Sequence, residues 1–179
     1  GWKDNKVLIF ASEVKPLLEI VPEIYELLPG HIFNGKDFVP QMMLPHQLLF
    51  KDDPYQIAQK LYDLLSEAVQ ECIATREIGS LLSGGIDSSA ISVIARHYIQ
   101  NFHTFAAGVT SAPDLYYARQ VAKYIGSTHH EAVVSRQELI TILPEVIYHL
   151  ESFDPLLVRS SLTNYLVIRL AAEYVPAIF

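Results

Sequence analysis

The sequence contains a single cysteine, Cys72, among its 179 residues. One cysteine excludes an internal disulfide framework and is typical of a reducing compartment, so we expect a cytoplasmic location. No apolar run is long enough to cross a bilayer and no signal peptide is visible, so we expect no membrane association. Basic residues are also scarce, with 13 lysines and arginines against 20 aspartates and glutamates. The formal net charge of −7 therefore argues against a broad nucleic-acid-binding surface.

Apolar residues make up 50% of the chain, which places it among globular proteins. The pattern of these residues changes near residue 53. Before that point the chain is β-rich: residues 6–11 predict a buried strand, and residues 31–39 predict a hairpin with Asn34-Gly35 as its two-residue turn. Residues 41–52 contain Pro45 and few periodic cues, so we expect a linker there.

From Asp53 onward, helical and strand patterns alternate. Asp53 is expected to cap a helix that starts at Pro54, with an apolar stripe that includes Leu61 and Leu64. The remaining pattern predicts strands at 77–82, 103–107, 130–134 and 175–179, and helices at 88–99, 115–125, 161–174 and after the capping box at 135–138. Strands separated by helices of this length predict an α/β fold, a parallel sheet with helices on both faces.

The most informative segment is Ser83-Gly84-Gly85-Ile86-Asp87-Ser88-Ser89, which lies between a predicted strand and a predicted helix. Its two glycines allow a sharp turn and a close approach of the backbone to a ligand. Unpaired N–H groups at the start of the helix favour a phosphate, and the serine hydroxyls add hydrogen bonds. Asp87 is suited to hold Mg²⁺ against the bound oxygens. The segment therefore predicts a pyrophosphate-binding loop that takes ATP.

The same loop has a purely structural interpretation, because Gly-Gly turns and Asp or Ser caps open many helices that bind nothing. The preceding strand and the two serines after Asp87 favour the nucleotide site. The loop contains no lysine, so it is not a Walker A box. A loop that binds pyrophosphate suits a reaction in which ATP is cleaved between its α- and β-phosphates and an adenylate forms.

The segment after the neighbouring strand, residues 107–114, should lie beside this loop. Backbone groups near Ala107 offer the donor and acceptor that an adenine edge requires. Asp114 is either a second carboxylate near the phosphates or the cap of the next helix, and the frequency of aspartate caps favours the cap. His129-His130 invites a metal site, but the absence of a ligand cluster at suitable spacing favours a structural role.

Several segments besides the loop match the pattern of one known family. They are Phe105-Ala-Ala-Gly108 with Ser111-Ala-Pro-Asp114, Gly126-Ser-Thr-His-His-Glu131, Val158-Arg-Ser-Ser161 and, upstream, Phe10-Ala-Ser-Glu-Val-Lys-Pro-Leu17. Together they resemble glutamine-dependent asparagine synthetases. The resemblance implies that residues 53–179 are the N-terminal part of an ATP pyrophosphatase domain with an adenine-nucleotide α-hydrolase-like fold. It also implies that residues 1–40 are the C-terminal part of a class II glutaminase-like domain.

The resemblance implies a ligase that adenylates aspartate with Mg²⁺ and ATP, and forms asparagine with ammonia from glutamine. Leu82 and Ala107 would contact the adenosine through backbone groups, and Asp114 would lie close to the phosphates. Pyrophosphate would be held by loop residues, namely Ser83, Gly84, Gly85, Asp87, Ser88 and Ser89, with Asp87 on the metal. Arg159 would be catalytic, facing the developing charge at the α-phosphate or the substrate. The alternative for Arg159 is an ion pair with Glu151 or Asp154.

The sequence departs from the family pattern at both ends. The N-terminal cysteine nucleophile of the glutaminase domain is absent, and the Ser-Gly-Glu-Gly loop expected after residues 175–179 is not reached. We therefore expect a fragment that is inactive alone, with an open sheet edge that favours a homodimer. Two alternatives stay open: a β-lactam-synthetase-like or other adenylating ATP pyrophosphatase, and a non-catalytic nucleotide-binding module.

Overall fold

The computed structural model describes residues 2–4, 7–41, 53–73 and 77–179, and the chain forms two compact units, Gly1–Lys51 and Asp52–Phe179. All of the predicted linker except Gln41 lies outside the described residues. The assignment of the first unit to a glutaminase-like domain stays a prediction. No helix in the described part of the chain is both long and apolar enough to span a membrane.

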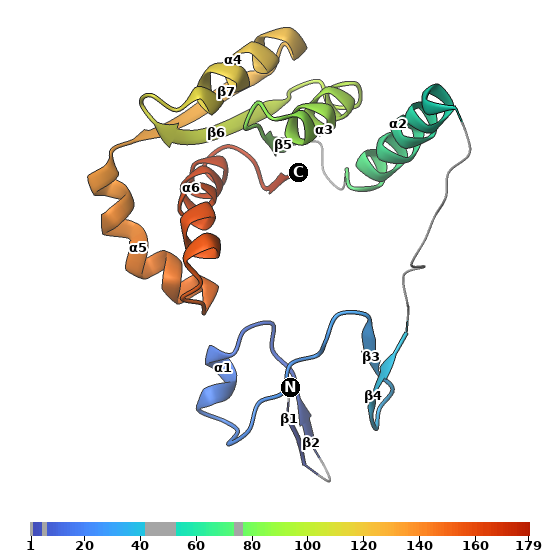
Figure 1. Ribbon diagram of the computed structural model, residues 1–179, viewed down its shortest axis with the longest axis vertical. Coiled ribbons are helices and arrows are strands. Elements are labelled where there is room, and N and C mark those ends of the chain that lie inside the picture. Colours follow the sequence, from blue (N-terminus) through green and yellow to red (C-terminus); the bar gives the residue numbers. More distant parts are fainter. Residues whose placement is uncertain (1, 5–6, 42–52, 74–76) are drawn as a thin grey trace. The chain divides into compact units, whose positions relative to one another are not determined.

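The described residues of the first unit form two antiparallel strand pairs and one short helix (Figure 1). Its elements are β1 (Trp2–Asp4), β2 (Val7–Ile9), α1 (Lys15–Leu18), β3 (His31–Phe33) and β4 (Phe38–Pro40). The pairing of β3 with β4 confirms the predicted hairpin. The pairing of β1 with β2 places the predicted strand at 6–11 in a second hairpin.

The turn between β3 and β4 differs from the predicted one. The N–H of Asn34 donates to the carbonyl of Asp37, so these two residues close the turn and Gly35-Lys36 form its centre. The Asn34 side chain accepts from the N–H groups of Lys36 and Asp37. Asn34 therefore stabilises the turn from its first position, while Gly35 takes the left-handed conformation at φ +96°.

The second unit alternates helices and strands, as predicted. Its elements are α2 (Pro54–Glu71), β5 (Ile78–Leu81), α3 (Ile86–Arg96), β6 (His103–Val109), α4 (Pro113–Ile125), β7 (Thr128–Val134), α5 (Arg136–Leu150), α6 (Pro155–Ala171) and β8 (Ala177–Ile178). Asp53 caps α2, and Ser135 with Glu138 forms the predicted capping box of α5. The positions that carry local start signals are therefore where the sequence predicts them.

The four strands of the second unit form one parallel sheet in the order β7-β6-β5-β8, with helices on both faces (Figure 1). On β6, Ala106 packs towards α4, whereas Phe105 packs towards α6. Next to α3, an apolar core cluster joins Ile78 of β5 to Ile94 of α3 and Val69 of α2. The predicted α/β fold is thus confirmed. Strands β5, β6 and β7 follow one another in one direction and β8 lies on the other side of β5, so the order reverses at β5.

Two helices differ from their predicted form. Helix α6 begins at Pro155 rather than at residue 161, because the Asp154 carboxylate accepts from the N–H groups of Leu156 and Leu157. Proline at the first helical position completes this start signal. Helix α2 has the predicted length, but the predicted stripe is largely exposed: Leu61 is 56% exposed, and Val69 is the buried residue of the helix.

Candidate functional site

The loop between β5 and α3 is shaped by Gly84 and Gly85. Gly84 has a left-handed backbone at φ +77°. A β-carbon placed there would lie 2.5 Å from Tyr117 Cβ and 2.6 Å from the Ala118 amide nitrogen. The turn therefore requires glycine at this position for both its conformation and its close contact with α4. Gly85 is the N-cap of α3 in extended conformation.

Serine hydroxyls brace the same loop from within. The Oγ atoms of Ser83 and Ser88 are 3.0 Å apart, and Ser88 Oγ also donates to the Gly85 carbonyl at 3.3 Å. The Gly85 N–H donates to Ser83 Oγ at 3.3 Å. The Ser89 hydroxyl oxygen is buried and has no hydrogen-bond partner among the described residues. These internal hydrogen bonds help to fix the shape of the loop, while one buried polar atom has no protein partner among the described residues.

The start of α3 has the properties of an anion site. Gly85 supplies no side chain to accept from the first-turn N–H groups, so these donors stay available at the positive end of the helix. Asp87 lies in the first turn and is exposed. A carboxylate there would repel a phosphate directly, whereas Mg²⁺ between them would bind both. The free donors and Asp87 therefore fit a metal-bound pyrophosphate.

A pocket of about 120 Å³ opens beside this loop, at the carboxyl ends of β5 and β6. It is lined by Leu81, Leu82, Ser83, Phe105, Ala106, Ala107, Asp114, Leu115, Thr163, Asn164 and Val167. Its walls therefore come from both strand ends and from α4 and α6, the helices on opposite faces of the sheet. This is the place where open α/β sheets bind ligands, because the strand order reverses at β5.

Comparison with known proteins identifies the family of this chain. The family described as Asparagine synthase matches residues 60–178, which include the loop and every residue that lines the pocket. The chain belongs to the asparagine synthase family. A probable glutamine-hydrolyzing asparagine synthetase of Dictyostelium discoideum is 32% identical over 94% of this chain and 34% of its own length. Glutamine-hydrolyzing asparagine synthetase 1 of Saccharomyces cerevisiae is 33% identical over 92% of this chain and 35% of its own.

The chain spans about a third of the length of these curated relatives. Among solved structures, the NMN synthetase of Francisella tularensis aligns with 72% of this chain and 54% of its own, with a TM-score of 0.48 and 16% sequence identity.

In this asparagine synthase family member, four predicted site residues line one pocket: Leu82, Ser83, Ala107 and Asp114. The other loop residues continue from Ser83 into α3 and do not line it: Gly84, Gly85, Asp87, Ser88 and Ser89. The preferred prediction for Asp114 as a helix cap is wrong. Ala112 is the N-cap of α4 and Pro113 is its first residue, so the Asp114 carboxylate is in the first turn.

Arg159 lies on α6, outside the pocket lining, and is exposed. It precedes Thr163 by four residues, so both are on the same helix face one turn apart. The Asp154 carboxylate, one of the two ion-pair partners considered from the sequence, caps α6 instead. Arg159 is thus placed one turn from the pocket, on the helix that forms one of its walls.

Sequence reasoning did not identify Thr163 and Asn164 of the pocket wall. The Thr163 hydroxyl donates to the Ser160 carbonyl within α6, whereas Asn164 is exposed. A signal for them existed, because asparagine and threonine are weak helix formers and these two lie in the middle of an apolar helix. That signal does not specify a ligand.

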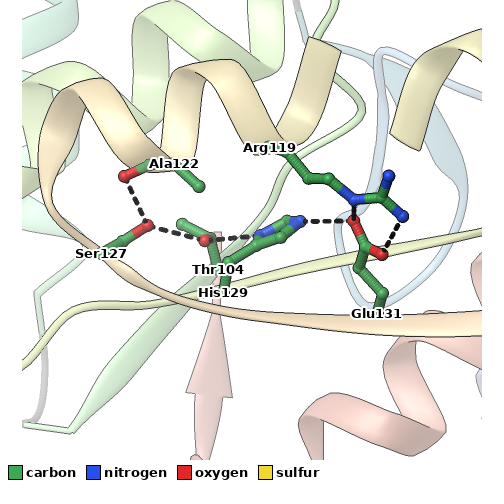
Figure 2. Close-up of polar contacts among 6 residues, drawn as sticks. All are labelled: Thr104, Arg119, Ala122, Ser127, His129 and Glu131. Carbon is green, nitrogen blue, oxygen red and sulfur yellow. Dashed lines mark hydrogen bonds and ion pairs between the residues drawn. The ribbon is translucent and has the colours of Figure 1, made fainter. Parts of the chain in front are cut away.

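A chain of polar contacts joins α4 to β6 and β7, as Figure 2 shows. The Arg119 guanidinium donates to both carboxylate oxygens of Glu131, at 2.7 and 2.6 Å. His129 Nε2 lies 3.2 Å from the same carboxylate, and its Nδ1 lies 2.9 Å from Thr104 Oγ1. The chain continues to Ser127, whose hydroxyl is 2.8 Å from that of Thr104 and donates to the Ala122 carbonyl of α4 at 3.5 Å.

The charges in this chain are set by burial and by the ion pair. Hydrogen bonds from Arg119 hold the pKa of Glu131 below its ordinary value, so the carboxylate is ionised at neutral pH. Burial lowers the pKa of His129 and outweighs the attraction of Glu131. The pKa of His130 is lowered mainly by burial and further by the charge of His103. The His130 Nε2 atom lies 2.9 Å from His103 Nδ1. Both predicted histidines are thus hydrogen-bonded within the sheet, and their structural role stays a prediction.

Proposed function

We propose that this chain carries the ATP-binding part of a glutamine-dependent asparagine synthetase. In the whole protein, a β-carboxylate oxygen of aspartate attacks the α-phosphorus of ATP, and pyrophosphate leaves. Ammonia derived from glutamine then attacks the acyl carbon and releases AMP, which yields asparagine. The observation that carries the proposal is the braced glycine loop with free helix N–H groups beside the pocket at the reversal of the sheet.

Each predicted site residue has a role in this proposal. The backbone groups of Leu82 and Ala107 hydrogen-bond the adenosine. The loop residues Ser83, Gly84, Gly85, Ser88 and Ser89 hold the pyrophosphate through N–H groups and hydroxyls. Asp87 binds Mg²⁺, which neutralises charge on the departing pyrophosphate. Asp114 lies near the phosphates, and Arg159 stabilises charge at the α-phosphate or the substrate carboxylate.

Three further features belong to the proposal. The first unit, up to residue 40, is the end of a glutaminase-like domain that supplies the ammonia. Strand β8 pairs with β5 on one side only among the described strands, so its open edge favours a homodimer. A cytoplasmic location agrees with the single cysteine.

Calorimetric titration of the chain with ATP and Mg²⁺ tests the nucleotide site. We expect Asp87→Ala to weaken Mg²⁺-ATP binding about tenfold or more, because the variant loses a charged metal contact. AMP has no pyrophosphate, so its affinity should not change. Asp63→Ala is the matched control, since Asp63 is an exposed aspartate of α2 and its loss changes the net charge equally. Equal binding of Mg²⁺-ATP by the Asp87 variant and the parent chain would refute the proposed site.

A chimera tests the reaction. The chain would replace the matching segment of the Saccharomyces cerevisiae asparagine synthetase 1 to which it is similar. We expect aspartate-dependent formation of asparagine, AMP and pyrophosphate. Formation of ADP and phosphate contradicts adenylation. Activity with a β-amino acid and none with aspartate would instead support the β-lactam-forming alternative.

A further inference from the structure

The amino-terminal half of α4 forms one wall of the candidate nucleotide site. Gly84 of the loop packs so tightly against Tyr117 and Ala118 that no β-carbon fits between them. Asp114, one turn earlier on the same helix, lines the pocket together with Ser83. The position of α4 along its own axis therefore determines both the shape of the loop and the place of the Asp114 carboxylate.

The apolar contacts of α4 give little resistance to axial sliding. Its buried residues are Leu115, Ala118 and Ala122, so two of the three side chains are single methyl groups. Methyl groups interdigitate little with a facing sheet, whereas large side chains lock a helix by filling matching gaps. The register of α4 therefore depends also on directional contacts. One lies at the carboxyl end of the helix, where the Arg96 guanidinium donates to the Ile125 carbonyl at 2.9 Å.

Arg119 supplies a second directional contact, and it directly follows Ala118, which lies against Gly84. Its two bonds to Glu131 are parallel and short, the geometry in which a guanidinium and a carboxylate recognise each other most specifically. Exposed ion pairs usually contribute little, and the Arg119 side chain is 55% exposed. Glu131, however, is only 17% exposed and has His129 as a second partner, so its position on β7 is well determined. A fixed carboxylate allows the ion pair to set the register of α4.

We propose that Arg119 is a positioning residue for the nucleotide site. Through Glu131 it holds α4 at the height where Tyr117 and Ala118 support Gly84, and where Asp114 reaches the pocket. This inference rests on the proposed function, because the site that it positions is the proposed Mg²⁺-ATP site. Arg119 itself is not among the residues that line the pocket.

Mg²⁺-ATP affinity of the chain, measured by calorimetry, tests the proposal. We expect Arg119→Ala to raise the Kd about five- to tenfold, because a charge-assisted bidentate contact is lost. Arg119→Lys should recover part of the affinity, since one of the two hydrogen bonds can form. Arg119→Glu and Glu131→Arg alone should both weaken binding, and the two changes combined should restore it by recreating the pair in reverse.

Ser135→Ala controls for general loss of stability. It removes the cap of α5, which does not line the pocket, and should lower the melting temperature without changing the Kd. Hydrogen exchange of residues 83–89, followed by mass spectrometry without nucleotide, adds a readout that needs no ligand. We expect faster exchange there in Arg119→Ala, and unchanged exchange in Ser135→Ala.

The outcomes separate this proposal from the proposed function. If the Arg119 variants bind Mg²⁺-ATP like the parent chain, and exchange at 83–89 is unchanged, Arg119 is no positioning residue, whatever their melting temperatures. The proposed function then stands as long as Asp87→Ala weakens binding. If Asp87→Ala has no effect, the proposed site fails. Faster loop exchange in Arg119→Ala would in that case still support the control of loop geometry by α4.

Discussion

The hydroxyl oxygens of Ser80 and Ser92 lie 2.9 Å apart in the core, and they join β5, the strand before the phosphate loop, to α3, the helix after it. Ser80 is 1% exposed and Ser92 is fully buried. The Ser92 hydroxyl donates to the Ser88 carbonyl at 2.7 Å, and the Ser80 hydroxyl donates to the Leu81 carbonyl at 3.3 Å. Two buried hydroxyls thus tie the base of the loop together.

Replacing one member of this pair should lower the free energy of unfolding by more than half as much as replacing both. We expect Ser80→Ala and Ser92→Ala each to lower the free energy of unfolding by about 1 kcal/mol, because each removes the hydrogen bond between two buried hydroxyls. The double variant should lose less than the sum, as expected for residues in direct contact. Urea unfolding of the four proteins gives the coupling energy. A strictly additive result would mean that the two hydroxyls act independently.

Gly84 and Gly126 both have left-handed backbones, at φ +77° and +65°, but differ in their surroundings. A β-carbon on Gly126 would meet nothing within 4 Å, whereas on Gly84 it would collide with α4. We expect Gly126→Ala to destabilise by about 1–2 kcal/mol from backbone strain alone. Gly84→Ala should cost about 3 kcal/mol or more, since overpacking adds to the strain. Equal losses in urea unfolding would argue against the close contact with α4.

The parallel sheet was predictable because each of its signals is local. A segment as short as β5 is too short for a stable helix. After Asp53, helical and strand patterns alternate regularly along the chain. The helix starts capped by Asp53 and Ser135 were also correct, because a cap needs only residues within one turn. The start capped by Asp154 was missed, although its signal is equally local. The loop at 83–89 was identified from local signals too, since its glycines and serines are consecutive.

The contacts that depend on tertiary packing were not predictable. Arg119 lies in no segment that the sequence singled out, and it meets Glu131 only because α4 lies over β7. Asn164 reaches the pocket because α6 covers the other face of the sheet. The role of Asp114 was misjudged for a local reason, because Pro113 already occupies the first helical position and moves the cap back to Ala112.

Thr104 is fully buried, and its hydroxyl lies within hydrogen-bond distance of Ser127 and His129. Thr104→Val keeps the shape of the side chain and removes both contacts. We expect a loss of about 1–3 kcal/mol in urea unfolding, because the His129 ring nitrogen is left without a partner in the interior. Thr141→Val on exposed α5 is the matched control and should be close to neutral. Similar small losses for both would show that the buried chain contributes little.

Stability should depend on pH through His129. Burial holds the pKa of His129 below its ordinary 6.5, so between these two values the unfolded chain binds more protons than the folded one. The free energy of unfolding should therefore rise with pH across this window and fall as the protein is acidified through it. His130, whose pKa is also lowered, contributes with the same sign. The lowered pKa of Glu131 adds a further loss of stability at more acidic pH, below its ordinary 4.5.

His129→Gln isolates the contribution of this one imidazole. Glutamine does not titrate, so the variant should show a shallower rise in unfolding free energy as the pH rises toward the ordinary histidine pKa of 6.5. His97→Gln is the control, because His97 lies exposed at the end of α3 and outside the polar chain. The measurement is urea unfolding at half-unit pH steps in one buffer mixture. A slope that is unchanged in His129→Gln, or steeper in the opposite direction, would mean that His129 is not held neutral by burial between α4 and the sheet.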